Sequence, residues 1–560
     1  TLDGTLFPYT TLFRSDMRRH GHTYDSIVSA ILEENATSCI PPLDEAEVKS
    51  IAATACHYNA ATAGLSGNQL ACEVIEIIKT AAELFVTPDG IMFAKIYKKK
   101  RKGVVPIASS DFTDYLRSLI FREYYLTLSK DAIEKACATL QGLATYQDVD
   151  LPVEECSVRI AHNGNYIYWD LADADGNIVA ISPEGWKVVT ECPINFRRPS
   201  GMRPLPVPSE GSFEKLREIM ALDDNSWLLI ASFVVGNFLP SGTFPLLVIQ
   251  GEQGSAKTTR MRLIKELVDP CAAPIRGSPT NSKDLLISIG NSHLIGYDNL
   301  SDIPAWLSDL LCQILSGCGA SERVLYTNDR ERIIEARRPL MVNSIEDIVS
   351  RSDLLDRSIV VDLPAIPPDQ KRLEREIFET FYEHRAEIMG GLLDILVATL
   401  RSIDAVNCET LSRLADFSQW IAAAETGFDV EPGTILAALD ESRNIATEEF
   451  VAGNPVIDTL RRYITKVNLA EIEIRPADLL SELNQLVAGN SNIYRSKYWP
   501  KAPRWLSTAL KRHAPNLRKS GISVDVGLRK DGHRLIRITT NAFKDVAAVI
   551  SDAGADPEAI

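Results

Sequence analysis

The sequence predicts an α/β multidomain protein. The chain has 560 residues, which is too many for one hydrophobic core. Helical and strand-like periodicities alternate along it, separated by breaks rich in glycine and proline. The apolar run FPLLVIQ at 244–250 is followed directly by GEQGSAKTT at 251–259 and then by a helical pattern. This is the order of a strand, a phosphate-binding loop and a helix.

The first fifteen residues, TLDGTLFPYTTLFRS, resemble a translated sequencing adapter. Their DGTLF is similar to the nucleophile motif of haloacid-dehalogenase phosphatases, but Thr1 stands where that motif needs a further aspartate. We therefore exclude residues 1–15 from the fold as a foreign segment. We expect the natural protein to begin upstream, with an additional N-terminal domain.

Residues 16–62 predict a helical N-terminal domain of two helices. The stretches GHTYDSIVSAILEEN and CIPPLDEAEVKSIAATA resemble the PriCT-type domain that follows primase-polymerase modules in phage and plasmid replication proteins. A generic helical hairpin is the alternative. This resemblance implies that the N-terminal primase-polymerase part is absent from the chain.

Residues 81–205 alternate short β-like runs with helical ones and predict a mixed α+β module. The run KKKRKG at 98–103 is either a nucleic-acid contact or the solvated tip of a hairpin. The proline-rich segment 196–211 reads as a linker into a P-loop domain at 212–364. A helical lid or collar is expected at 365–450, a further domain at 451–545 and a tail at 546–560.

The loop after the apolar run contains the residues that bind nucleotide phosphates in such loops. Backbone N–H groups surround a phosphate, a lysine neutralises charge and a hydroxyl completes the Mg²⁺ shell. Ala256 departs from the usual GxxxxGK[ST] spelling, in which a glycine precedes the lysine. The predicted ATP-binding residues are Gly251, Gly254, Ser255, Ala256, Lys257, Thr258 and Thr259, with Thr258 as a metal ligand.

An acidic residue follows about forty residues later. The strand-like run HLIGYDNLS ends in Asp298, which is placed to hold Mg²⁺ through water. Asn299 stands where many ATPases have the glutamate that orients the attacking water. Glu252, Asp302 and Glu322 are the alternatives for the catalytic base, and the sequence does not choose between them.

Two further polar residues follow in the order in which ATPases have their functional residues along the sequence: loop, acid, asparagine and arginine. The apolar run RPLMVNSIE ends in Asn343, which we assign as the polar sensor of the γ-phosphate or its water. Arg357 follows in the run RSDLLDRSIVVDLP, with Arg351 as the alternative. We assign it as an arginine finger, which stabilises charge on the transferred phosphoryl group in the site of a neighbouring subunit. The predicted catalytic residues are therefore Lys257, Asp298, Asn343 and Arg357.

These motifs resemble the AAA+ ATPase module of phage and mobile-element primase-helicases, which are related to the superfamily-three helicases. The similarity lies in FPLLVIQGEQGSAKTT, HLIGYDNLSDIPAWLSDLLCQILSGCGASERVLYTNDRE, RRPLMVNSI and SDLLDRSI, and extends over about 81–540. It implies a homohexameric ring that hydrolyses ATP with Mg²⁺ and moves along single-stranded or forked DNA. The β-rich runs RVLYT and RIIEA flank the turn-forming Asn328-Asp329 and predict a hairpin. The resemblance implies that this hairpin projects into the channel of the ring, with Arg330 and Arg332 near phosphates. Pairing of these arginines with Asp329 and Glu331 is the alternative.

The C-terminal region contains a second basic patch. From Arg495 to Arg537 there are 12 Lys/Arg against 2 acids, in a chain with net charge −16. A helix followed by a hairpin predicts a winged helix at 451–545 that binds DNA, or alternatively a partner protein. Trp499 and Trp505 are expected in its core rather than stacked on bases. The predicted DNA contacts here are Lys511, Arg512, Arg529 and Lys530.

The composition limits the class of protein. No apolar run reaches the length of a membrane span, and the 10 cysteines lack a CxxC pair. We expect no membrane partner, reduced thiols, and a cytoplasmic location in a bacterial or phage-infected cell. The leading hypothesis is an ATP-dependent DNA helicase or translocase acting in replication. The alternative is an ATP-regulated initiator or loader that separates no strands.

Overall fold

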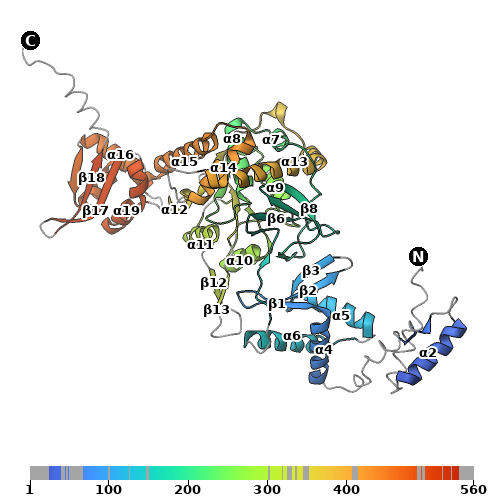
Figure 1. Ribbon diagram of the computed structural model, residues 1–560. Helices are drawn as coiled ribbons and strands as arrows, with labels where there is room; N and C mark the ends of the chain where they lie inside the picture. Colours follow the sequence, from blue (N-terminus) through green and yellow to red (C-terminus); the bar gives the residue numbers. More distant parts are fainter. Residues whose placement is uncertain are drawn as a thin grey trace, which may run out of the picture. The chain divides into compact units, whose positions relative to one another are not determined.

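The computed structural model divides the chain into two units (Figure 1). Unit 1 contains Thr1–Ser157 and Ile194–Arg198, and unit 2 contains Val158–Pro193 and Pro199–Ile560. The residues that the structure describes are 24–38, 44–45, 48–49, 67–98, 101–124, 127–146, 151–300, 303–317, 320–323, 331–334, 337–344, 352–406, 414–468, 470–488, 493–494, 499–519, 521–530 and 533–540. The prediction of a mixed α/β multidomain protein is confirmed by several sheets and many helices.

Unit 1 is built on a three-stranded antiparallel sheet in the order β1-β2-β3. Its hydrophobic core includes Val74, Ile96 and Phe112, contributed by two helices and the sheet. A short parallel pair, β4 with β9, joins its two chain segments. The elements are α2 (Tyr24–Ser38), α4 (Gly67–Ala81), β1 (Glu83–Val86), β2 (Met92–Lys98), β3 (Arg101–Pro106), α5 (Ser110–Tyr124), α6 (Lys130–Thr145), β4 (Cys156–Ser157) and β9 (Asn195–Phe196).

The basic run at 98–103 falls on a hairpin of unit 1. Lys98 at the end of β2 pairs with Arg101 at the start of β3. The side chains of the run lie outside the described residues. In the predicted domain at 16–62, α2 covers the run YDSIVSAILEEN, whereas most of the second expected helix lies outside the described residues.

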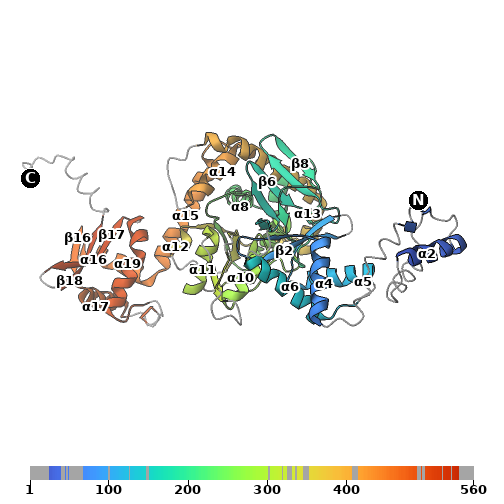
Figure 2. The same cartoon turned by 60° about the horizontal axis from the view of Figure 1, so that its bottom comes forward.

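The predicted module at 81–205 is divided between the two units, because residues 158–193 belong to unit 2. They form an antiparallel meander of β5 (Ile160–Asn163), β6 (Tyr166–Asp170), β7 (Ile178–Ser182) and β8 (Gly185–Val189). Trp169 and Val179 of this meander share one hydrophobic core with the central sheet of unit 2. Figures 1 and 2 show β6 and β8 beside helix α13. The meander therefore folds with the central sheet rather than with unit 1.

A buried ion cluster fixes the meander to the end of helix α9 (Lys257–Val268). Arg159, which is fully buried, donates through Nε to Asp269 Oδ1 at 3.0 Å. Lys265 Nζ donates to the other oxygen of the same carboxylate at 2.7 Å. The Lys265 and Arg159 charges hold the pKa of Asp269 well below its usual range, although burial alone would raise it. Loss of one partner would leave a buried charge unpaired.

The central sheet of unit 2 has four parallel strands in the order β11-β14-β10-β15. Its strands are apolar over nearly their whole length because helices cover the sheet. The strands are β10 (Leu246–Gln250), β11 (Ile295–Tyr297), β14 (Leu340–Asn343) and β15 (Ser358–Asp362). The connecting elements are α7 (Glu214–Met220), α8 (Asp224–Gly236), α9 (Lys257–Val268), α10 (Ser282–Asn291), α11 (Ala305–Ser316), β12 (Ala320–Arg323), β13 (Glu331–Ile334) and α12 (Ser352–Leu355).

The region expected as a helical lid is helical and contributes to the same core as the sheet. Its elements are η2 (Pro368–Gln370), α13 (Glu374–Ser402), η3 (Ile403–Ala405), α14 (Ala415–Phe428) and α15 (Thr434–Gly453). Gly390 and Gly391 let the linker before α7 cross α13 closely. A Cβ at Gly390 would lie 1.8 Å from the carbonyl oxygen of Ser209, so no larger residue fits there.

The C-terminal part of unit 2 has a hydrophobic core of its own, which includes Leu460, Leu510 and Ile536. Its elements are α16 (Pro455–Val467), β16 (Glu471–Ile474), α17 (Pro476–Val487), α19 (Pro503–Lys519), β17 (Ile522–Lys530) and β18 (His533–Thr540), and its sheet order is β16-β18-β17. Trp499 lies in the core and donates to Asn484. The expectation of a core position is wrong for Trp505, which is 51% exposed because it lies on the outward side of α19.

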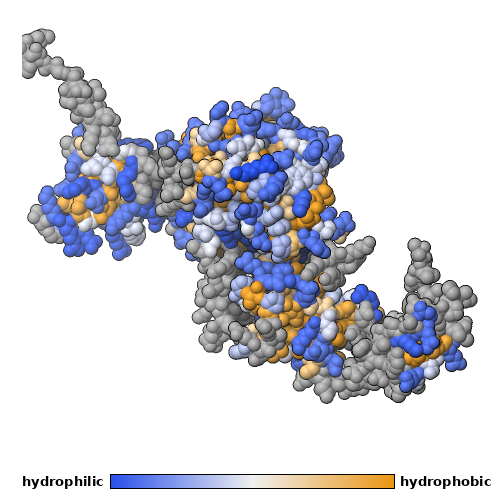
Figure 3. Space-filling model, viewed as in Figure 1, coloured by the Kyte–Doolittle hydropathy of each residue, from blue (hydrophilic) through white to orange (hydrophobic). Residues whose placement is uncertain are grey.

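None of the helices among the described residues is long and apolar enough to cross a membrane. On the face seen in Figure 3, hydrophobic residues form small groups between hydrophilic ones rather than one broad band.

Candidate nucleotide-binding site

The segment between β10 and α9 forms a tight loop at the carboxyl edge of the central sheet. Gly251 has a φ of 137°, and a Cβ there would lie 2.2 Å from the carbonyl oxygen of Leu363. Gly254 has a φ of 91°. Both positions need glycine, because L residues with side chains rarely adopt these backbone angles.

Ala256 precedes the first residue of α9 in the left-handed conformation, with φ 53° and ψ 32°. This is the position at which such loops usually have glycine. An alanine there costs on the order of 1–2 kcal/mol relative to the right-handed region. The chain therefore adopts at residue 256 a backbone conformation that favours glycine, although alanine stands there.

The side chain of Lys257 folds back and bonds to the start of the loop. Its ammonium group donates to the carbonyl oxygens of Gly251 at 2.6 Å and of Glu252 at 2.9 Å. Burial lowers the pKa of Lys257, and the charges of Asp298 and Asp362 oppose that shift. Ser255 is buried and donates through its hydroxyl to the carbonyl oxygen of Glu252 at 2.9 Å. Lys257 therefore lies where it could exchange loop carbonyls for phosphate oxygens.

Three of the predicted polar side chains meet beside this loop. The hydroxyl of Thr258 donates to Asp298 Oδ1 at 3.0 Å, and Asn343 Nδ2 donates to the same hydroxyl at 3.3 Å. Asn343 is only 2% exposed. The carboxyl ends of parallel strands lie at one edge of a sheet, so residues that follow β10, β11 and β14 come together there. Thr259, the last residue predicted from the loop, lies in the first turn of α9 and lines the adjacent pocket.

Asn299 contributes through its backbone. Its N–H donates to Asn343 Oδ1 at 2.6 Å, and its φ is 55°. Among the alternatives for a catalytic base, Glu252 is exposed on the loop. Asp302 and the side chain of Glu322 lie outside the described residues.

Arg357 is not brought to this group of residues. It precedes β15 and donates through Nη1 to the carbonyl oxygen of Asp353 at 2.7 Å. Because β15 is parallel to β10, Arg357 lies at the amino edge of the sheet, about 16 Å of strand from the carboxyl edge, where the loop after β10 lies. It does not serve the loop of its own chain in this structure. Arg351 lies outside the described residues.

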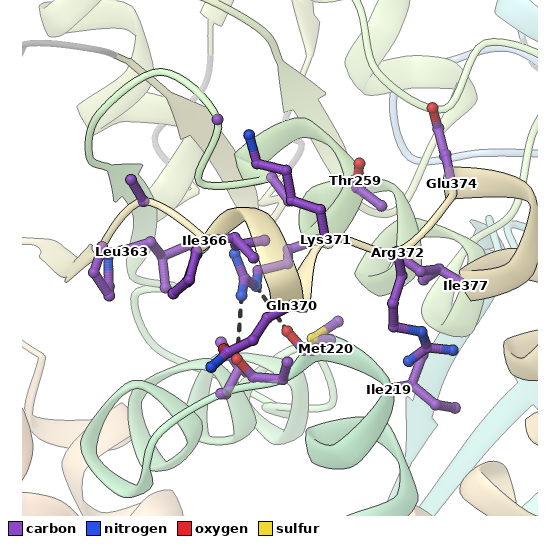
Figure 4. A pocket seen from close by; sticks show the side chains of 18 of the residues that line it. Ile219, Met220, Thr259, Leu363, Ile366, Gln370, Lys371, Arg372, Glu374 and Ile377 are labelled. Carbon is purple, nitrogen blue, oxygen red and sulfur yellow. Dashed lines mark hydrogen bonds between the residues drawn. The ribbon is translucent and has the colours of Figure 1, made fainter.

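A cavity of about 420 Å³ opens beside the loop (Figure 4). It is lined by the end of α7, the loop with the first turns of α9, and the segment from Leu363 to Ile377. Apolar side chains such as Met220, Leu363 and Ile366 alternate with polar ones such as Gln370. A planar aromatic group attached to a phosphate on the loop matches this mixture.

Two cations at the cavity were not predicted from the sequence. Arg260 is buried and donates to the carbonyl oxygens of Ser255, Met220 at 3.0 Å and Ala221 at 3.2 Å. It thereby joins the loop to the end of α7. The exposed Lys371 lines the cavity, and its Nζ would be 4.0 Å from a Cβ at Gly254. A short sequence motif could not predict these roles, because Arg260 contacts Met220 and Ala221 and Lys371 lies near Gly254, and each pair is distant in the sequence.

The predicted DNA contacts fall in two regions of the chain, at 330–332 and at 511–530, and the structure describes part of them. β12 pairs with β13, but Arg330 and the side chain of Arg332 lie outside the described residues. Lys511 and Arg512 are exposed on α19, and Arg529 and Lys530 are exposed at the end of β17. Lys530 forms an ion pair with Glu473 at 3.2 Å, so part of its charge is already neutralised.

Comparisons with known proteins place parts of the chain in a family. Residues 216–444 match the model described as actinomycete integrative conjugative element replication protein. Residues 456–549 match the model described as AICE RepA C-terminal domain. No curated protein matches the chain.

Solved structures of the NrS-1 C-terminal region in the apo state also match, at low similarity. The alignment with the A form covers 85% of this chain and 100% of the NrS-1 chain, with 13% identity and a TM-score of 0.38. A second apo structure, of residues 305–718, has 11% identity with the same coverage and TM-score. The two family matches follow one another along the chain, so residues 216–444 and 456–549 are similar to the replication proteins of actinomycete integrative conjugative elements.

Proposed function

We propose that this replication protein of a mobile element is an ATP-dependent DNA helicase or translocase. The observation that carries the proposal is the meeting of Thr258, Asp298 and Asn343 beside the Lys257 loop. These are the residue types that bind phosphates, hold a divalent cation and orient water in ATP hydrolysis. The adjacent cavity is large enough for a nucleobase. We assign the domain at 212–364 as an AAA+ P-loop ATPase core.

The oxygen atoms at this site fit Mg²⁺. Mg²⁺ prefers oxygen ligands at about 2.0–2.1 Å in an octahedron, whose neighbouring ligands are about 2.9 Å apart. The Thr258 hydroxyl and the Asp298 carboxylate are separated by 3.0 Å. Bound there with ATP, the ion would neutralise charge on the phosphates. Thr258 would ligate it, and Asp298 would hold it directly or through water.

The other residues of the site have separate roles in the proposed ATP hydrolysis. Loop N–H groups and Lys257 bind phosphates, and Asn343, held by the Asn299 N–H, orients the attacking water. The place of Arg357 at the opposite edge of the sheet supports a role in the site of a neighbouring subunit, which requires a ring such as a homohexamer. Each site would then be complete only at a subunit contact.

We further propose that the C-terminal domain is a winged helix that binds DNA. The order α16, β16, α17, α19 and then the β17–β18 hairpin supports this assignment. Lys511 and Arg512 on α19 and Arg529 near the hairpin turn would contact phosphates. Arg332 in β13 and Arg330, which lies outside the described residues, remain proposed contacts in the channel of the ring.

The experiment is ATP hydrolysis by the purified chain with and without single-stranded DNA. The proposal predicts Mg²⁺-dependent hydrolysis that the DNA stimulates and that Lys257→Ala abolishes. Lys130→Ala, which removes an exposed lysine of unit 1, is the matched control and should retain activity. If the wild-type chain with DNA hydrolyses no ATP, the motor proposal is wrong.

A specific observation favours a second function, an initiator or loader controlled by nucleotide. Asn299 has no carboxylate where a catalytic glutamate is common, and it engages Asn343 through its backbone. A chain that binds ATP and assembles, but hydrolyses it too slowly to displace a strand, would act in this way.

A further inference from the structure

Helix α19 has one buried and one exposed side. Leu506, Leu510, His513 and Leu517 follow helical spacing and point into the core of the C-terminal domain. The exposed side contains Arg504, Trp505, Thr508, Lys511 and Arg512. Trp505 is 51% exposed, although tryptophan is usually largely buried. A large aromatic face is thus presented among cations on one helix.

Cations lie against the exposed aromatic rings of this region. The guanidinium carbon of Arg504 is 5.8 Å from the ring centroid of Trp505. Lys501 Nζ is 4.4 Å from the ring centroid of Tyr494, which is 47% exposed. The same aromatic and basic pairing therefore occurs twice around the start of α19.

The positive charge of α19 differs from that of the neighbouring sheet. Lys530 and Arg537 are engaged by Glu473, whose pKa they lower. Within the part of the chain that the structure describes, Arg504 and Lys511 take part in no ion pair. The α19 charges are therefore available for an anion that carries flat groups.

Unpaired nucleotides have the chemistry that this surface fits. Single-stranded nucleic acid offers both phosphates and exposed base faces, and aromatic side chains that stack on bases contribute to its binding. In a duplex the base faces are covered by their neighbours, so only phosphates and groove edges remain accessible. A surface with cations alone would not distinguish the two forms by stacking.

We propose that Trp505 stacks on an unpaired base and that Arg504 and Lys511 bind the flanking phosphates, so that α19 selects single-stranded over duplex DNA. This inference rests on the proposal that the C-terminal domain binds DNA, but it does not depend on ATP hydrolysis. It assigns α19 a preference for unwound DNA instead of a general affinity for phosphate.

The test measures binding of the full chain, without nucleotide, to an oligothymidylate and to a duplex of equal length. Trp505→Ala should weaken single-strand binding by about 5- to 100-fold and leave duplex binding within about twofold. Trp505→Phe, which keeps an aromatic face, should recover most of the loss. Lys511→Ala should weaken both and make binding less dependent on salt.

Trp306→Ala is the matched control, because Trp306 is 40% exposed on α11, outside the C-terminal domain. An equal loss of single-strand binding in Trp306→Ala, or an equal loss for both DNA forms in Trp505→Ala, would overturn the stacking role while DNA binding itself stands. If Trp505→Ala changes self-association but not DNA binding, the surface is a protein contact and the inference is wrong. Absence of all DNA binding by the wild-type chain would refute this inference and DNA binding by the domain together.

Discussion

The Thr258 hydroxyl donates a hydrogen bond to the Asp298 carboxylate at 3.0 Å, although the two residues are 40 positions apart in the sequence. The bond joins the first turn of α9 to the end of β11. In the proposed function these two oxygens are ligands of Mg²⁺, directly or through water. The bond would then hold both side chains in place before the ion and nucleotide bind.

We predict that Asp298→Asn weakens Mg²⁺-dependent hydrolysis. The amide keeps the shape and can still accept from Thr258, but it removes the charge that attracts the ion. The concentration of Mg²⁺ needed for half-maximal ATPase activity should rise by about 10- to 100-fold. Unchanged Mg²⁺ dependence in this variant would exclude Asp298 from the metal site.

Ala256 provides a test of loop geometry. Ala256→Gly should retain nucleotide binding and be at least as stable, because relief of about 1–2 kcal/mol of backbone cost offsets the extra entropy of glycine in the unfolded chain. Ala256→Val should lose nucleotide binding, since a β-branched residue is strongly disfavoured at φ 53°. Thermal unfolding and titration with a fluorescent ATP analogue measure the two effects. Equal behaviour of the glycine and valine variants would contradict the left-handed geometry.

Arg260 should anchor the loop for nucleotide binding. Arg260→Ala leaves the carbonyl oxygens of Ser255, Met220 and Ala221 without their donor, which costs at least about 2 kcal/mol of stability. ATP affinity should fall by about tenfold or more, since the loop is no longer fixed to α7. Arg375→Ala, at an exposed position of α13, is the control for loss of an arginine. Unaltered affinity in Arg260→Ala would show that the anchor does not matter for binding.

A mixing experiment tests the position of Arg357. Lys257→Ala and Arg357→Ala should each be inactive alone. In a mixed ring, the Arg357→Ala subunit keeps its loop and can receive Arg357 from a Lys257→Ala neighbour, so part of the ATPase activity should return. A mixture that assembles but stays inactive would contradict action between subunits.

Two buried histidines, His293 and His513, and the half-buried His162 predict loss of stability in mild acid. Burial lowers the pKa of His293 to about 3 and of His162 and His513 to about 4, against about 6.5 in an unfolded chain. The unfolded state therefore binds more protons below pH 6.5, and stability falls as the pH drops from there towards 4. Each histidine contributes a slope of up to about 1.4 kcal/mol per pH unit.

Denaturant unfolding at pH 7 and pH 5 measures this effect. His293→Gln, whose amide can still donate to the carbonyl oxygen of Asn237, should lose about a third of the histidine-dependent slope. The same pH dependence in His293→Gln and the wild type would contradict the assignment.

Local patterns in the sequence predicted the α/β multidomain fold, and they selected three polar residues that the structure brings together in the candidate site. The order of loop, acid and asparagine could be predicted because each residue directly follows a short apolar strand. Parallel pairing then brings the strand ends together, as the contacts of Asp298 and Asn343 show.

Contacts between distant segments could not be predicted in this way. Arg159 meets Asp269 across 110 positions, and this buried pair places the meander in unit 2 rather than in the predicted 81–205 module. Trp505 was expected in the core because tryptophan is usually buried, but its position on α19 faces away from it. Which helix side faces the core depends on neighbours that the local pattern does not contain.

The most direct test of the central claim is strand displacement on a forked DNA duplex with Mg²⁺ and ATP. The account predicts that the wild-type chain releases the displaced strand with ATP but not with ADP, and that Lys257→Ala fails while Lys130→Ala retains activity. A wild-type chain that binds ATP, assembles on the fork and hydrolyses the nucleotide, yet releases no strand, would contradict the helicase assignment.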